Sequence, residues 1–181
     1  MRLFLGIKPS ETAKSILTAS LVPIVRKYPD ANWVPAENYH LSVFFIGEVP
    51  EDPWYLERLN KKIDKILFEQ SSFYLYSSHL DLYMQQKIVM YLSFIREKKL
   101  ETLVSLIQAS LPIHPEEKTY LPHITVARTK IPSKQQYFLM KKTLERTRID
   151  LEFQVKELIL FESLNGGKNP IYKKLSAFPL L

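Results

Sequence analysis

A four-residue pattern occurs twice in this chain of 181 residues, and it constrains the fold more than any other feature. Residues 40–43 read His-Leu-Ser-Val and residues 123–126 read His-Ile-Thr-Val, with nearly half of the chain between them. Side chains alternate between the two faces of a β-strand. We therefore expect each tetrad to form a strand that buries its two aliphatic residues. The histidine and the hydroxyl then share the other face, about 6.6 Å apart along the strand.

The sequence around the two tetrads alternates between strand and helix patterns. Apolar residues at helical spacing, with helix starts at Ser10, Asp52-Pro53 and Ser133, indicate four helices, and period-two alternation indicates strands. Tight hairpins outnumber crossovers, which favours antiparallel pairing. Strands are expected at 1–9, 40–46, 72–83, 87–95, 123–128, 149–160 and 170–178, and helices at 10–28, 52–67, 100–111 and 133–146.

These patterns predict an α+β fold. We expect two pseudo-symmetric lobes, each an antiparallel β-sheet with helices packed on the outside, and an active groove between the lobes where the tetrads converge. No low-complexity linker divides the chain, so residues 1–181 are expected to form a single bilobal domain. Pro23 is expected to kink or shorten the first helix, and a slip in alternation at Lys156-Glu157 indicates a β-bulge.

Composition excludes several classes of function. With no cysteine, the chain has no thiol nucleophile, disulfide or cysteine-ligated metal site, which fits a reducing, cytoplasmic setting. Only 4 glycines are present and no glycine-rich phosphate loop occurs, so Rossmann and P-loop folds have no support. The net charge of +6 attracts polyanions such as nucleic acid, although an ordinary basic protein carries the same charge. We expect no membrane-spanning helix, because no apolar run reaches about 18 residues, and no signal peptide.

The paired tetrads have a natural chemical use. Histidine titrates near pH 6.5, so two imidazoles on opposite sides of a phosphodiester can act as general base and general acid. Two hydroxyls can bind the non-bridging oxygens between them, and no metal, cofactor or covalent intermediate is needed. The other histidines fit less well, because His79 resembles a solvated strand residue and His114 lies in a proline-bounded loop. A metal site with remote carboxylates and a serine hydrolase without a GxSxG elbow are weaker alternatives.

The sequence around both tetrads resembles the two-histidine (2H) phosphoesterases, in particular the LigT-like RNA 2′,3′-cyclic phosphodiesterases, historically called 2′-5′ RNA ligases. Residues 32–49 are similar to the first signature of that family, ending in the Phe-aliphatic-Gly of the motif. Residues 121–128, Leu-Pro-His-Ile-Thr-Val-Ala-Arg, are similar to the second signature. The opening strand and the tail from Leu160 to Leu180 also match in style, so the resemblance covers nearly the whole chain.

The resemblance implies a metal- and cofactor-independent enzyme that hydrolyses RNA 2′,3′-cyclic phosphate ends to 2′-phosphomonoesters. His40 and His123 are its expected catalytic pair, with His123 activating water and His40 protonating the leaving 3′-oxygen. Ser42 and Thr125 are expected to bind the phosphoryl oxygens. The first motif usually carries threonine where this chain has Ser42, and serine keeps the donor but loses the methyl that fixes its rotamer.

The resemblance also implies two substrate-binding residues, Arg128 on the phosphate and Phe45 close to the groove. Tyr120 and Lys118 precede the second tetrad and are candidates for holding RNA, although solvated loop residues give the same pattern. We expect a monomer whose partner is RNA or a nucleotide with a 2′,3′-cyclic phosphate, and no membrane. Two alternatives stay open: 2′-5′ ligation or cleavage by the same residues, and a non-catalytic module that binds RNA ends.

Overall fold

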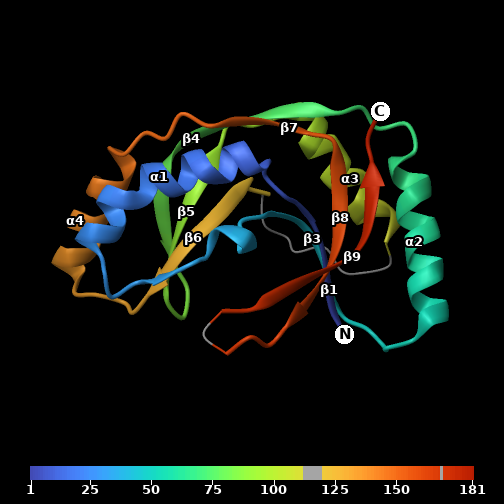
Figure 1. Ribbon diagram of the computed structural model, residues 1–181, viewed down its shortest axis with the longest axis horizontal. Coiled ribbons are helices and arrows are strands. Elements are labelled where there is room, and N and C mark those ends of the chain that lie inside the picture. The colour runs from blue at the N-terminus through green and yellow to red at the C-terminus, as the bar shows by residue number, and fades with distance from the viewer. Residues whose placement is uncertain (112–119, 168) are drawn as a thin grey trace.

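The computed structural model describes residues 1–111, 120–167 and 169–181. It has the α+β architecture expected from the sequence, with antiparallel strands between flanking helices (Figure 1). None of the described helices is long and apolar enough to cross a membrane. The elements are β1 (Arg2–Ile7), α1 (Glu11–Lys27), β2 (Asn32–Trp33), the 3-10 helix η1 (Ala36–Asn38), β3 (Leu41–Glu48), α2 (Pro53–Leu67), β4 (Phe73–Met84), β5 (Ile88–Phe94), α3 (Lys98–Ser110), β6 (His123–Thr129), α4 (Lys134–Glu145), β7 (Glu152–Val155), β8 (Glu157–Leu164) and β9 (Ile171–Pro179).

Side-chain caps begin three of the helices at the residues expected from the sequence. Ser10 Oγ accepts a hydrogen bond from the backbone N–H of Ala13 at 3.2 Å, and Asp52 Oδ1 accepts one from Trp54 at 3.0 Å. Ser133 starts α4 in a capping box. Each cap satisfies an N–H that has no partner inside its own helix, which explains why the helices begin there.

One local expectation was wrong in part and another was wrong. Pro23 does not shorten α1, which continues to Lys27. Pro23 and Ala19 lie on the exposed side of the helix, where water can satisfy the carbonyl that the proline leaves without a partner. The slip at Lys156-Glu157 is not a bulge within one strand. It is the point where the chain leaves β7, paired with β4, and enters β8, paired with β1 and β9.

The strands follow the order β7-β4-β5-β6-β3-β1-β8-β9, with β2 paired to β6. We call β3, β1, β8 and β9 the first half, because it carries the first tetrad, and β6, β5, β4 and β7 the second half. The two halves meet at a single backbone pair, in which Leu41 of β3 lies opposite Ile124 of β6. The two halves are therefore joined by the fewest paired residues at the point where the two tetrads meet.

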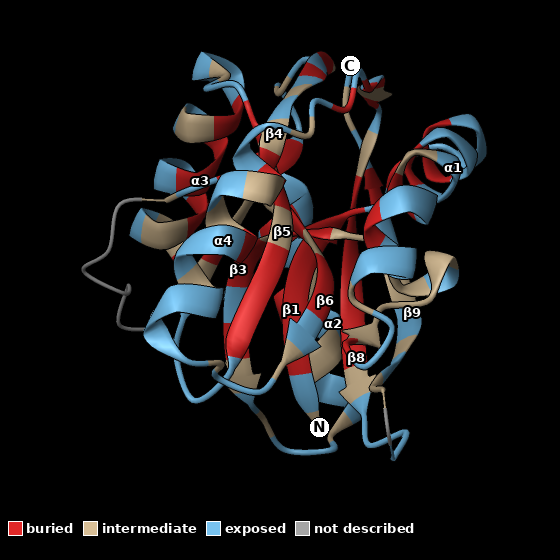
Figure 2. Ribbon diagram, turned by 90° about the vertical axis from the view of Figure 1, so that its left-hand side faces the viewer, coloured by how far each residue is buried: buried red, intermediate tan, exposed pale blue. Residues whose placement is uncertain are grey.

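Helices pack on both halves, and a helix does not always pack on the half whose strand precedes it in the sequence. α3 follows a strand of the second half but packs with α2 against β3 and β9 of the first half. α1 follows β1 of the first half, and its C-terminal end contacts α4, which packs on β4 of the second half. Lys27 Nζ of α1 donates a hydrogen bond to Thr143 Oγ1 of α4 at 2.9 Å. Buried residues gather on the strands and on the inward sides of the helices (Figure 2).

Candidate active site

The contact between Leu41 and Ile124 brings the two tetrads together. Both residues are fully buried, so their neighbours on either side face away from the core. In an antiparallel pair, the residue before one member lies opposite the residue after the other. His40 therefore lies across from Thr125, and Ser42 lies across from His123. We call these four side chains the square, with the two imidazoles on one diagonal and the two hydroxyls on the other.

The two halves repeat the same strand register around this square. In the first half, Gly6 of β1 pairs with Ser42, and the next pair, Leu5 with Phe44, skips one residue of β3. In the second half, Tyr91 of β5 pairs with Thr125, and the next pair also skips one residue of β6. Val43 and Val126 are the skipped residues, and both are buried. The two halves thus carry a bulge at the same place.

The matched bulges determine which residues return to the groove. An extra residue changes the alternation of a strand, so the third residue after each hydroxyl, rather than the second, shares its face. That residue is Phe45 in β3 and Arg128 in β6, and the two hold equivalent positions. Phe45 is 57% exposed, and Arg128 is also exposed. The structure therefore places both of these sequence-predicted residues beside the tetrads.

Both imidazoles are held in the same tautomer. His40 Nδ1 lies 2.8 Å from the carbonyl oxygen of Asn38, and His123 Nδ1 lies 2.8 Å from that of Leu121. A carbonyl oxygen only accepts, so each Nδ1 carries the proton and donates it. Nε2 of each ring therefore remains for proton transfer, and the backbone two residues upstream fixes the orientation of the ring.

The surroundings of His40 are aromatic and mostly apolar. Its ring centroid lies 4.6 Å from Tyr172, 5.0 Å from Phe4 and 6.2 Å from Phe161. Burial lowers the pKa of His40 to about 4, and the nearby charge of Arg128 acts in the same direction. At neutral pH, His40 of the free protein is therefore an unprotonated imidazole.

The surroundings of His123 are more polar. Its ring lies 5.2 Å from Tyr91 and 6.1 Å from Tyr83, and the hydroxyl of Tyr91 donates to Asp81 Oδ2 at 3.2 Å. Burial lowers the pKa of His123, and the charge of Arg128 contributes. Tyr91 takes the position that Gly6 holds in the first half, where a side chain would be tightly packed.

In that first-half position the aromatic rings come close to the backbone. A Cβ on Gly6 would lie 3.3 Å from ring atoms of both Phe4 and Phe161, and 3.2 Å from the carbonyl oxygen of Leu41. The absence of a side chain lets these two rings reach His40, whereas Tyr91 supplies the equivalent ring of the second half directly.

Tyr120 has a different position from the one considered in the sequence. Its hydroxyl donates a hydrogen bond to the backbone carbonyl of Ser42 at 2.9 Å, so it connects the segment before the second tetrad to the first tetrad. Burial raises the pKa of this hydroxyl. Tyr120 is therefore neither a solvated loop residue nor a hydroxyl free to bind RNA, and it holds the two halves in register.

The other candidate residues lie outside the square. His79 of β4 contacts Ser78 Oγ at 2.9 Å through Nδ1 and Ser93 Oγ at 3.4 Å, and it makes no ring contact with either tetrad histidine. His114 and Lys118 lie outside the described residues. Among the residues that the structure does describe, no three histidine or acidic side chains gather as a metal-binding group.

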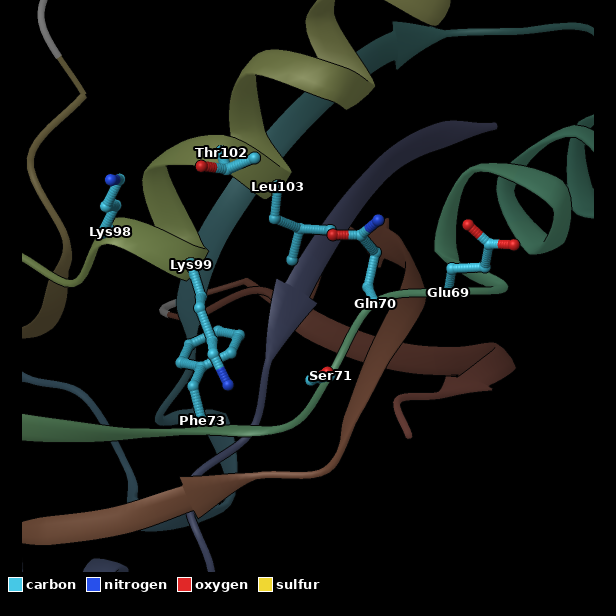
Figure 3. A pocket seen from close by; sticks show the side chains of 8 residues that line it. All are labelled: Glu69, Gln70, Ser71, Phe73, Lys98, Lys99, Thr102 and Leu103. Carbon is cyan, nitrogen blue, oxygen red and sulfur yellow. The ribbon is translucent and has the colours of Figure 1, made fainter.

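A separate hollow lies at the start of α3 and the turn that leads into β4 (Figure 3). The Lys99 side chain lies beside Phe73 and donates a hydrogen bond to the carbonyl of Ser72 at 3.2 Å. Its eight lining residues include neither a histidine nor any of the tetrad residues. The hollow therefore lacks the chemistry found at the contact between the two halves.

Comparison with known proteins places this geometry in a family. Residues 10–167 match the model of the 2′-5′ RNA ligase superfamily. The chain belongs to this superfamily. A relative from Thermotoga maritima, named RNA 2′,3′-cyclic phosphodiesterase, is 26% identical over 184 residues and matches 97% of this chain and 93% of its own length.

Two solved structures share the fold of this chain. TT0787 of Thermus thermophilus superposes with a TM-score of 0.76 at 23% identity, covering 99% of this chain and 98% of its own. E. coli LigT complexed with 3′-AMP also gives a TM-score of 0.76, at 19% identity, covering 99% and 97%. These likenesses confirm the expected fold of two antiparallel halves.

The sequence did not reveal the aromatic residues around the histidines of this superfamily member. Phe4, Phe161 and Tyr172 come from β1, β8 and β9, and Tyr83 and Tyr91 come from β4 and β5. In the sequence they read as ordinary strand residues. The pairing of β1 and β5 with the tetrad strands brings rings to the histidines, and no local sequence pattern indicates that pairing.

Proposed function

We propose that this protein hydrolyses 2′,3′-cyclic phosphate ends of RNA to 2′-phosphomonoesters by acid–base catalysis between His40 and His123. The observation that carries the proposal is the square at Leu41 and Ile124, in which two imidazoles face each other across two hydroxyls. Each imidazole presents Nε2, because its Nδ1–H is held by a backbone carbonyl. The name of the Thermotoga maritima relative and the 3′-AMP complex of E. coli LigT support a ribonucleotide substrate.

In this proposal, the phosphorus lies at the centre of the square. Ser42 and Thr125 donate hydrogen bonds to the two non-bridging oxygens, which keeps the phosphorus between the imidazoles. One imidazole takes a proton from water as that water attacks, and the other gives a proton to the ribose 3′-oxygen as the P–O bond breaks. The diagonal placement suits this in-line exchange. The residues themselves perform each proton transfer, so the proposed reaction needs no metal or cofactor.

The two histidines differ in which role their surroundings favour. The family resemblance implies that His123 activates water and that His40 protonates the leaving oxygen. The pKa of His40, lowered to about 4, favours the opposite assignment, because a general base must be unprotonated before the reaction and His40 loses its proton more readily than an ordinary histidine. The polar surroundings of His123 suit the acid. We propose the assignment with His40 as base and His123 as acid.

Incubation of the purified protein with an oligoribonucleotide that ends in a 2′,3′-cyclic phosphate tests the function. We expect a mass increase of one water and a 2′-phosphate product, and we expect the same rate with EDTA present. A parallel reaction with a 5′-hydroxyl RNA acceptor detects 2′-5′ ligation. Binding of the oligonucleotide without any product would instead support a module that binds RNA ends.

A further inference from the structure

A basic hollow shares Arg128 with the groove face of β6, and its other lining residues have no part in the proposed reaction. It has a volume of about 360 Å³ and lies between the ends of β5 and β6 and the segment that leads into β9. Lys87 precedes β5, Lys130 follows β6, and Arg128 lies near the end of β6. Small-molecule sites have volumes of roughly 300–1,000 Å³, so the hollow has room for a phosphate with part of a nucleotide.

The charge of the hollow is positive. Lys87, Arg128 and Lys130 line it together with one acidic residue, Asp30. Throughout the described ranges, none of the three cations forms a salt bridge with Asp30 or with any other carboxylate. Three cations against one carboxylate leave an excess that attracts a phosphate, since backbone phosphates supply most of the affinity of proteins for nucleic acid.

The far wall of the hollow is the segment before β9, which is held by residues of β2 and η1. Asn32 of β2 donates a hydrogen bond from Nδ2 to Oδ1 of Asn169 at 3.1 Å, and Asn38 donates one to the carbonyl of Pro170 at 2.8 Å. These contacts fix the segment before β9 against the second half. The hollow is therefore enclosed on two sides by elements from different halves.

Arg128 connects the hollow to the reacting centre. Its guanidinium lies close enough to lower the pKa of both His40 and His123, and it lines the hollow at the same time. The bulge after Thr125 turns Arg128 onto the groove face, at most about 10 Å along the strand from that hydroxyl. Arg128 therefore places one positive charge between the square and the hollow.

We propose that this hollow binds the 5′-phosphate of the terminal nucleoside while the cyclic phosphate of the same nucleoside lies in the square. This inference rests on the proposed function and deepens it. A cyclic phosphate forms at the 3′ end of a strand, so the next phosphate along the chain is the one on the 5′ side of that nucleoside. The substrate class is then an RNA end rather than a free cyclic mononucleotide.

Three substrates that differ by one group test the proposal: a nucleoside 2′,3′-cyclic phosphate, the same compound with a 5′-phosphate, and a dinucleotide that ends in the cyclic phosphate. We expect kcat/KM of the second and third substrates to exceed that of the first by about tenfold, the usual size of a charged hydrogen-bond contact. In the variant Lys87→Gln/Lys130→Gln, this preference should fall to about twofold or less. A weaker salt dependence of kcat/KM for the dinucleotide should accompany it, since each lost contact removes a slope of about 0.7.

The matched control is Lys62→Gln/Lys65→Gln, which removes the same charge from exposed positions of α2 and should keep the full preference. Equal rates for the first two substrates in the wild-type protein would overturn the inference, and so would a preference that survives Lys87→Gln/Lys130→Gln. A gain seen only with the dinucleotide would assign the effect to the additional nucleoside and overturn it as well. Failure of the proposed function is distinct, because no substrate of the three would then be turned over.

Discussion

The two halves of this protein have the same backbone arrangement around the tetrads, but different side chains surround the two histidines. Register, bulge position and the Nδ1 hydrogen bond agree in β3 and β6. Two phenylalanines and a tyrosine surround His40, whereas two tyrosines, one bound to a carboxylate, surround His123. A symmetric frame can thus hold two identical imidazoles in equivalent geometry while their surroundings keep one unprotonated more readily than the other.

Removing either imidazole is the change with the largest expected effect. His40→Ala and His123→Ala should each lower kcat by about 10²–10⁴-fold, the usual contribution of a general acid or base. The double variant should be little worse than either single one, because groups that act as a unit have non-additive effects. Steady-state kinetics on the cyclic-phosphate oligonucleotide measures all three.

His79→Ala is the matched control, since His79 is a histidine of the second half that lies outside the square. It should keep wild-type rates. If His40→Ala or His123→Ala also kept near-wild-type rates while folded, the acid–base pair would have to be abandoned.

A substrate whose leaving group needs no proton distinguishes which histidine is the acid and which is the base. When sulfur replaces the bridging 3′-oxygen, the leaving thiolate is far more stable, because a thiol has a pKa near 8.5. We expect kcat of His123→Ala to be about 10²-fold higher on this substrate than on the oxygen compound, and kcat of His40→Ala to change little. Recovery of His40→Ala instead would restore the assignment that the family resemblance implies.

Most of the fold was predictable because it depends on local patterns. The caps at Ser10, Asp52 and Ser133 and the alternation in the tetrad strands appear directly in the sequence. The change of strand from β7 to β8 at Lys156 was not predictable, because a one-residue slip in alternation looks the same in a bulge and in a change of partner strand. Which strand pairs with which depends on packing between distant segments.

The candidate site was only partly predictable for the same reason. The tetrads identified the four polar side chains of the square, since alternation alone assigns them to one face. Phe45 and Arg128 were expected from family resemblance, but only the register shows that the bulges at Val43 and Val126 place them beside the square. The inward-facing Tyr120 hydroxyl had no signal, because its acceptor is a backbone carbonyl distant in sequence.

Phe45 and Arg128 hold equivalent positions but have different side-chain chemistry, so substitutions at the two positions should change different kinetic constants. Arg128→Lys should lower kcat/KM about tenfold despite keeping the charge, because an ammonium does not reproduce the two-pronged contact of a guanidinium with phosphate. Phe45→Ala should raise KM by about threefold to tenfold with little change in kcat, since an exposed ring contributes by stacking on a base. If Arg128→Lys is unimpaired, the arginine has no role at the phosphate, whereas the histidine pair is unaffected.

The lowered pKa values predict an acidic maximum for kcat/KM. The base must be neutral, so activity rises as pH rises through its pKa, which is about 4 if His40 is the base. The acid must be protonated, so activity falls as pH rises through the pKa of His123, which lies below its ordinary value of 6.5. The profile is therefore a bell with its maximum below pH 6.5, and its limbs belong to the coupled pair.

The profile of kcat should lie at higher pH, because bound phosphate stabilises both imidazolium forms. Rates measured from about pH 4 to 9 in buffers of constant ionic strength check both curves. A maximum of kcat/KM above pH 7 would show that the walls of the two halves do not lower the histidine pKa values as described.

The smallest effect concerns the hydrogen bond that crosses between the halves. Tyr120→Phe keeps the ring but leaves the carbonyl of Ser42 without the hydroxyl that it accepts from. We expect a loss of about 0.5–1.5 kcal/mol in the free energy of unfolding, measured by denaturant titration.

The same variant should also affect catalysis. Ser42 lacks the methyl that stiffens Thr125 in the other half, so the position of its hydroxyl depends on this backbone hydrogen bond, and kcat should fall about threefold. Adding Ser42→Thr to Tyr120→Phe should restore kcat but not stability, since threonine stiffens the rotamer without replacing the hydrogen bond. A loss of stability with an unchanged kcat would make Tyr120 a structural link between the halves and nothing more.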